Sequence, residues 1–146
     1  YGSNLNVRQM RMRCPDAVII GTAFIPDYRL LFKGSKSGNY LTIEPHSGSQ
    51  VPVAVWAVSV RDERQLDIYE GFPNFYYKKG FSLDVKQSES RKICKLTAFA
   101  YIMHEERKLG LPSTSYLQTC GTGYRDFGFD LQYLLDAIDV SRKVVQ

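Results

Sequence analysis

Two carboxylates in the middle of the chain have the type and spacing for acid–base chemistry. Asp67 and Glu70 lie three positions apart in LDIYEG (66–71), and at that spacing both side chains fall on one face of a helix. A glutamate at the C-terminal end of a helix is unfavourable beside the negative end of the helix dipole. In an aromatic pocket near another carboxylate, Glu70 would have a raised pKa and act as a base near neutral pH. Taken alone, the pattern favours the alternative, an ordinary solvated glutamate.

The first six residues, YGSNLN, predict a strand end, a tight turn and the start of a helix. Gly2 permits a close backbone approach or a positive φ, and Ser3 and Asn4 carry the short polar side chains that cap helices. The helical composition that follows ends at Pro15. Such a turn directs several backbone N–H groups to one place, which suits a carboxylate or phosphate. From these residues alone, a helix cap that binds no ligand is the commoner case.

The other reactive residue types show no recognisable catalytic pattern. His46 and His104 have no partner at metal-ligand spacing, so no metal site is predicted. The chain has no G-x-S-x-G sequence, which argues against a Ser–His hydrolase. The glycines of GTGYRDFG (121–128) have the wrong spacing for a dinucleotide site and follow no predicted strand. Cys120 is more typical of a buried, unreactive cysteine than of a nucleophile.

The composition predicts one soluble globular domain over residues 1–146, with 44% hydrophobic and 23% charged residues. A net charge of +4 with no basic run argues against a nucleic-acid partner. Three cysteines without a CxxC pair favour a reducing cytoplasmic compartment. The sequence shows no signal peptide and no apolar run of membrane-spanning length, so no membrane partner is expected.

The hydrophobic patterns predict a strand-rich first half, later helices and an α+β fold. Gly, Ser and Gln at 47–50 predict a hairpin turn. A short helix is expected over 61–72, with Asp62 as its N-cap and Gly71 at its end. Leu131, Leu134, Leu135 and Ile138 would form the apolar stripe of the last helix. Strands are predicted over 17–25, 28–34, 39–45, 51–60, 75–85 and 91–103, and the late helices over 113–127 and 130–145. These elements indicate a mixed sheet or small barrel-like sheet with peripheral helices.

Three blocks in this order resemble the gamma-glutamylcyclotransferase-like family. They are YGSNL at the start, LDIYEGFPNFYYKK (66–79) in the middle and YLQTCGTGYRDFG (116–128) near the end. The order and separation of the blocks are also similar to that family, and the resemblance spans essentially the whole chain. It implies a small mixed α/β, barrel-like fold, in agreement with the predicted elements.

The resemblance implies an enzyme that cleaves γ-glutamyl amides without water. In this family the substrate's α-amino group attacks its own γ-amide carbonyl, which gives 5-oxoproline and a free amine or amino acid. The glutamate before glycine in LDxxEG, here Glu70, would be the general acid/base. No cofactor, metal or covalent intermediate is implied, and the enzyme would be a monomer or homodimer. The substrate-binding residues implied are Tyr1, Gly2, Ser3, Asn4 and Leu5 of the first block, Tyr116 of the last block, and either Tyr76 or Tyr77.

Two other functions are compatible with the same resemblance. One is an enzyme that removes a γ-glutamyl protecting group from a biosynthetic intermediate, which would differ only on the leaving-group side of the pocket. The other is a non-catalytic module that binds γ-glutamyl ligands, since a fold does not fix a function. The presence of Glu70 argues against the second, because a binder needs no base. Ser3 is expected to bind substrate rather than act as a nucleophile, because no base lies at a recognisable spacing.

Overall fold

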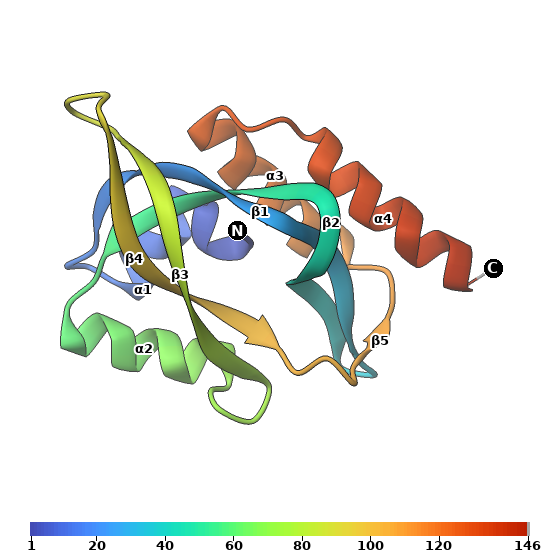
Figure 1. Ribbon diagram of the computed structural model, residues 1–146. Helices are drawn as coiled ribbons and strands as arrows, with labels where there is room; N and C mark the ends of the chain where they lie inside the picture. The colour runs from blue at the N-terminus through green and yellow to red at the C-terminus, as the bar shows by residue number, and fades with distance from the viewer. Residues whose placement is uncertain (146) are drawn as a thin grey trace.

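The computed structural model describes residues 1–145 and consists of two long antiparallel hairpins with helices around them (Figure 1). The elements are η1 (Ser3–Leu5, a 3-10 turn), α1 (Val7–Arg13), β1 (Val18–Ser35), β2 (Gly38–Ala57), α2 (Val60–Glu70), β3 (Tyr76–Gln87), β4 (Ile93–Met103), β5 (Lys108–Leu109), α3 (Thr114–Phe127) and α4 (Gln132–Val145). The predicted α+β class is confirmed. None of the helices within residues 1–145 has the length and apolar composition needed to cross a bilayer.

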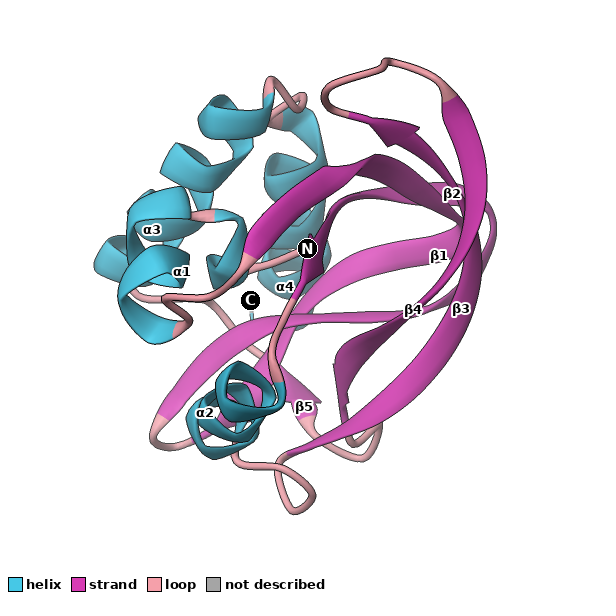
Figure 2. Cartoon of the chain, turned by 90° about the vertical axis from the view of Figure 1, so that its left-hand side faces the viewer, coloured by secondary structure: helices cyan, strands magenta, loops and turns pink. Residues whose placement is uncertain are grey.

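The sheet has the strand order β2-β1-β3-β4, and the short β5 pairs with β1. The two hairpins meet where Gly21 pairs with Gln87 and Thr22 with Lys86. A Cβ at position 21 would lie 2.0 Å from the backbone oxygen of Lys86, so a glycine is needed for this approach. Beyond this junction the hairpins form no further backbone ladder in the part of the chain that the structure describes, although the Met103 N–H on β4 donates to the Thr42 hydroxyl on β2 at 3.0 Å. The strands gather on one side of the molecule, and α1, α3 and α4 lie on the other (Figure 2).

The predicted division of the first hairpin into four strands was wrong. The ranges 17–25 and 28–34 form one strand, β1, and 39–45 and 51–60 merge into β2, which ends at Ala57. The turn predicted at 47–50 is a bend within β2, where the Gly48 N–H donates to Oδ1 of Asp27 on β1 (3.0 Å). Asp27 has a φ of 59° and interrupts the register, so these turn-type residues bend the ribbon without reversing it.

Helices α1, α2 and α3 each begin at a polar residue, Asn6, Ser59 or Ser113, whose side chain accepts a backbone N–H of the first turn. Gly71 ends α2 in the left-handed region with a φ of 64°, as predicted. The predicted N-cap Asp62 was wrong: the Ser59 hydroxyl accepts the Asp62 N–H at 3.1 Å, and Asp62 is buried in the first turn. Ser113 caps α3 in the same way.

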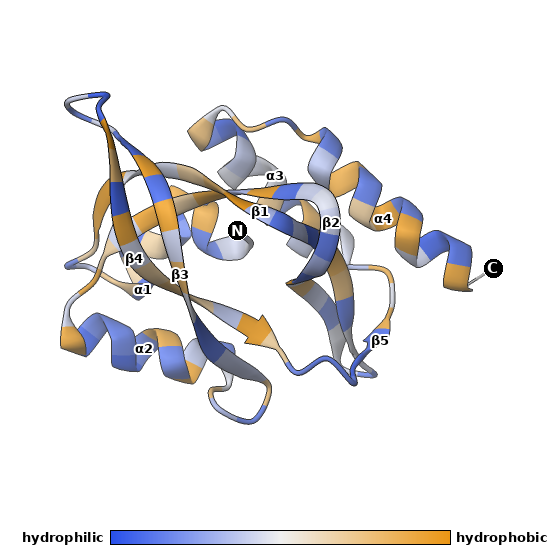
Figure 3. Cartoon of the chain, in the orientation of Figure 1, coloured by the Kyte–Doolittle hydropathy of each residue, from blue (hydrophilic) through white to orange (hydrophobic). Residues whose placement is uncertain are grey.

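The core lies between the first hairpin and the two C-terminal helices. Leu134 and Ile138 of α4 pack against the β1–β2 side of the core, whereas Leu135, predicted to share their stripe, is 51% exposed. Apolar and polar residues alternate over 80–86 of β3 (Figure 3), and half-buried and exposed residues alternate over 93–100 of β4, so each strand directs one apolar face inward there. The inward face of this hairpin forms one wall of a cavity.

Candidate active site

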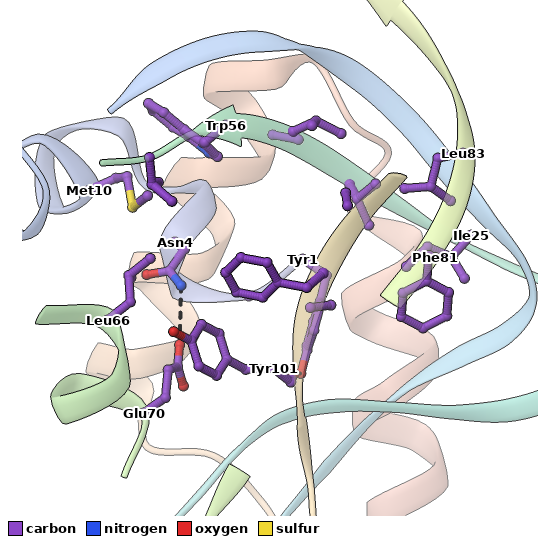
Figure 4. A pocket seen from close by; sticks show the side chains of 18 of the residues that line it. Tyr1, Asn4, Met10, Ile25, Trp56, Leu66, Glu70, Phe81, Leu83 and Tyr101 are labelled. Atoms are coloured by element: carbon purple, nitrogen blue, oxygen red, sulfur yellow. Dashed lines mark hydrogen bonds between the residues drawn. The ribbon is translucent and has the colours of Figure 1, made fainter. Parts of the chain in front are cut away.

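A cavity of about 440 Å³ lies between the two hairpins and is closed at one end by the first turn of the chain and α2. It brings together residues that are far apart in the sequence, among them most of those expected to bind substrate (Figure 4). The expected residues that line it are Tyr1, Gly2, Ser3, Asn4, Glu70, Tyr76 and Tyr116.

Glu70 is held at the polar end of this cavity by a short chain of hydrogen bonds. The Asn4 amide donates to Oε1 of Glu70 at 3.1 Å, and the Arg13 guanidinium donates to the Asn4 carbonyl at 2.5 Å. These bonds fix the orientation of the Asn4 amide, with its NH₂ toward the carboxylate. Burial raises the pKa of Glu70 to about 7, against the opposing effects of the Asn4 bond and the Arg13 charge. A carboxylate with this pKa accepts and returns a proton near neutral pH.

The first residues form the predicted tight turn, as the 3-10 turn η1, but Tyr1 does not end a strand. The Ser3 hydroxyl is hydrogen-bonded to the Tyr69 hydroxyl at 2.9 Å, beside Glu70 on α2. The turn packs directly on α3, because a Cβ at Gly123 would lie 2.5 Å from the Leu5 carbonyl carbon. Asn6, not Ser3 or Asn4, is the N-cap of α1. The Asn4 side chain therefore caps no helix, and its amide donates to Glu70 instead.

Two of the tyrosines share one backbone anchor. The Tyr76 hydroxyl donates to the Leu41 carbonyl at 2.8 Å, and the Tyr116 hydroxyl accepts the Leu41 N–H at 3.1 Å. Burial raises the pKa of both phenols well above the ordinary value, so both stay protonated at neutral pH. The Tyr116 hydroxyl also interacts with the Cys120 side chain, so it is held between Leu41 and α3.

Two of the residues expected to bind substrate lie outside the cavity lining. Leu5 is 1% exposed and packs in the core. Tyr77 donates its hydroxyl to Glu105, and its ring lies beside His104. Of the two tyrosines between which the sequence left a choice, only Tyr76 lines the cavity.

A group of charged residues that the sequence analysis did not assign fixes α2 against the second hairpin. The ammonium of Lys78 on β3 lies 2.7 Å from Oε2 of Glu63 and 2.8 Å from Oδ1 of Asp67. The Tyr101 hydroxyl also donates to Asp67, at 2.6 Å. Although burial opposes it, the bonds from Lys78 and Tyr101 hold the pKa of Asp67 below its ordinary value. The i,i+4 spacing of Glu63 and Asp67 indicates that both carboxylates lie on one face of α2. The local sequence does not indicate that their cationic partner, Lys78, lies on β3.

Arg13 is a second residue that sequence reasoning missed. Its guanidinium lies 3.6 Å from the centroid of the Tyr69 ring, and it also donates to Gln9 one turn earlier in α1. This stacking places the guanidinium between α1 and α2. Its position depends on how those helices pack, so no local pattern indicates it.

The comparisons with known proteins show the family. Residues 1–118 match the family described as "Gamma-glutamyl cyclotransferase, AIG2-like". The gamma-glutamylcyclotransferase of Bos taurus is 29% identical over 140 residues, covering 91% of this chain and 72% of the bovine protein, and that of Homo sapiens is 27% identical with the same coverage. A solved structure named gamma-glutamyl cyclotransferase superposes with a TM-score of 0.76 at 25% identity, over 94% of this chain and 82% of that one. The chain belongs to the gamma-glutamyl cyclotransferase family and is an enzyme of that type.

Proposed function

We propose that this enzyme converts a γ-glutamyl amide to 5-oxoproline and a free amine, with Glu70 as the general acid/base. The observation that carries the proposal is the Glu70 carboxylate in the cavity wall, bonded to Asn4 and with a pKa of about 7. The relatives named gamma-glutamylcyclotransferase support the reaction type.

The reaction needs one group that takes protons from the attacking nitrogen and gives them to the leaving nitrogen. The substrate's α-ammonium first gives a proton to Glu70, and the amine then attacks the γ-carbonyl carbon and forms the new C–N bond. Protonated Glu70 gives this proton to the amide nitrogen and then takes the second proton from the attacking nitrogen. The tetrahedral oxyanion collapses, the amide C–N bond breaks, and Glu70 passes the second proton to the released amine. Over the whole reaction the attacking nitrogen loses two protons and the leaving nitrogen gains two, and no water is consumed.

The remaining parts of the site position the glutamyl group. The first N–H groups of a helical turn have no acceptor within that turn and suit an anion such as the α-carboxylate or the oxyanion. Ser3 and Asn4, the first residues of η1, line the cavity with Glu70, so their N–H groups are the candidates for this contact. Because nucleophile and electrophile share one molecule, holding the ring-closing conformation supplies a large part of the rate, roughly 7–11 kcal/mol at best.

The direct test is 5-oxoproline release by the wild type, Glu70→Gln and Glu89→Gln. Glu70→Gln keeps the shape and removes the base, so turnover should fall by about 10²–10⁴-fold. Glu89 is exposed in the turn between β3 and β4, and Glu89→Gln should retain wild-type turnover. Near-normal turnover by a folded Glu70→Gln protein would refute the role of Glu70.

We also propose that residues 1–146 act as one domain, as a monomer or homodimer, in the cytoplasm. A single core cluster that joins both hairpins to α3 and α4 supports the one-domain assignment. The free thiols of Cys14, Cys94 and Cys120 support a reducing compartment. Burial also raises the pKa of Cys120 to about 11, which agrees with an unreactive thiol.

A further inference from the structure

The cavity has two ends of different chemistry. Asn4 and Glu70 lie at the polar end, and the Tyr1 ring lies between them and an apolar end that contains Phe81 and Leu83 (Figure 4). We call this second part the apolar end. The residues that define it are Val55, Phe81, Leu83, Leu96 and Ala98, from β2, β3 and β4.

The pairing of β3 with β4 gives the apolar end a continuous floor. Phe81 is opposite Ala98 and Leu83 is opposite Leu96, so the four side chains share one face of the hairpin. Val55 contributes from β2, in the other hairpin. Leu96 and Ala98 stay partly exposed, so this floor is accessible from the cavity.

The cavity is larger than the glutamyl group requires. A γ-glutamyl group has nine non-hydrogen atoms, which fill roughly 270 Å³ even at the ~30 Å³ that a water molecule occupies in the liquid. The cavity measures about 440 Å³. Since the glutamyl end must lie at Glu70, the remaining space is on the leaving-group side.

The charge of the lining favours a particular kind of leaving group. Within residues 1–145, the cavity lining includes the carboxylates of Glu63 and Glu70 but no lysine, arginine or histidine. An amino acid as leaving group carries its own carboxylate, and moving that charge out of water without a cationic partner is strongly unfavourable. An amine that carries only an apolar group avoids this penalty and buries its surface against the apolar end.

We propose, on the basis of the proposed function, that the apolar end binds the leaving group and selects γ-glutamyl amides of apolar amines that lack a carboxylate. The polar end fixes the glutamyl group, and Phe81, Leu96 and Ala98 contact the substituent on the amide nitrogen. Selectivity therefore depends on the inward face of the β3–β4 hairpin.

Three substrates with one common product test this proposal. They are γ-glutamyl-2-phenylethylamine, γ-glutamyl-phenylalanine, which differs from it by one carboxylate, and γ-glutamyl-ethylamine, which lacks the ring. Measured as 5-oxoproline release, kcat/KM should be at least about tenfold higher for the phenylethylamine amide than for either of the others. Equal or higher kcat/KM for γ-glutamyl-phenylalanine would overturn the proposal and leave the proposed function intact. Release from none of the three would overturn both.

A matched pair of variants tests whether selectivity for the leaving group depends on the apolar end. Ala98→Phe fills the apolar end, and Ala57→Phe places the same side chain at an exposed position at the end of β2. Ala98→Phe should lower kcat/KM for the phenylethylamine amide by about tenfold or more and retain activity on γ-glutamyl-ethylamine, which also reports that the variant is folded. Ala57→Phe should change neither. Unchanged kcat/KM for the phenylethylamine amide in folded Ala98→Phe would contradict the assignment.

Discussion

At the scale of single residues, Glu70 is placed where a glutamate stabilises the fold least. It is the last residue of α2, where a negative charge opposes the helix dipole, and burial raises its pKa to about 7. In the folded protein the protonated form is therefore favoured compared with the unfolded chain. At roughly 1.4 kcal/mol per tenfold change in the acid constant, the ionised carboxylate destabilises the fold by about 3 kcal/mol. This placement is understandable if the residue is retained for proton transfer.

This destabilisation predicts a pH-dependent gain from Glu70→Gln. Both forms of the chain are protonated at Glu70 below about pH 4.5, and the unfolded chain releases its proton first as the pH rises. The stability lost through Glu70 therefore grows between about pH 4.5 and 7 and is complete above that. Urea unfolding should show Glu70→Gln more stable than the wild type at pH 8 by about 1–3 kcal/mol, and by less at pH 5. The control Glu89→Gln should differ from the wild type by the same free energy of unfolding at both pH values. The same result for Glu70→Gln would contradict the raised pKa of Glu70.

At the scale of the elements, the ion pairs of Lys78 with Glu63 and Asp67 hold the C-terminal part of α2 against β3. Lys78 joins Glu63 and Asp67 to β3, and Glu70 is less than one turn further along α2. Lys78→Met should destabilise the protein by about 1–3 kcal/mol, since it leaves two partly buried carboxylates without their cation, and should also lower kcat. The exposed pair Lys95–Asp84 provides the control, and Lys95→Met should change stability by less than about 0.5 kcal/mol. If the two variants lose the same free energy of unfolding in urea, the Lys78 ion pairs stabilise the protein no more than an exposed pair does.

Local sequence patterns predicted these elements well where one residue decides the structure. Gly71 ends α2 as predicted, and the helix predicted from residue 113 begins at Ser113 as its cap, because each acts through its own backbone or a neighbouring N–H. The patterns failed at Asp27 and Gly48, where turn-type residues on paired strands bend a continuous ribbon. Whether such residues reverse or bend a chain depends on the partner strand, which a single stretch of sequence does not contain.

At the scale of the whole molecule, the site lies between two hairpins whose strands pair at one place, where Gly21 and Thr22 face Gln87 and Lys86. Gly21 allows that contact, since a Cβ there would lie 2.0 Å from the Lys86 oxygen. Gly21→Ala should destabilise the protein by at least about 2 kcal/mol, because backbone atoms must move apart. Gly80→Ala is the matched control on the same sheet, where the nearest atom is 4.0 Å away, and its effect should stay within about 1 kcal/mol. Similar urea midpoints for the two variants would refute a tight junction at Gly21.

The sequence indicated part of the candidate site and missed the rest for a physical reason. Glu70, Asn4 and Tyr116 lie in short blocks that the family resemblance identified, and the structure brings all three to one cavity. Arg13 and Lys78 act across elements, so their roles appear only when the helices and strands are packed. The apolar end likewise consists of ordinary strand residues whose shared face depends on the hairpin register.

The most direct test of the central claim is a titration of Glu70 in the free enzyme beside the pH profile of kcat/KM. The Glu70 carboxyl can be followed by ¹³C NMR and assigned by its loss in Glu70→Gln, while 5-oxoproline release is measured from pH 5 to 8. We expect the carboxyl to titrate with a pKa of about 7 and kcat/KM to rise with deprotonation at the same pH. A Glu70 that titrates near its ordinary value of 4.5, or a rate that does not change as it titrates, would contradict its role as the base.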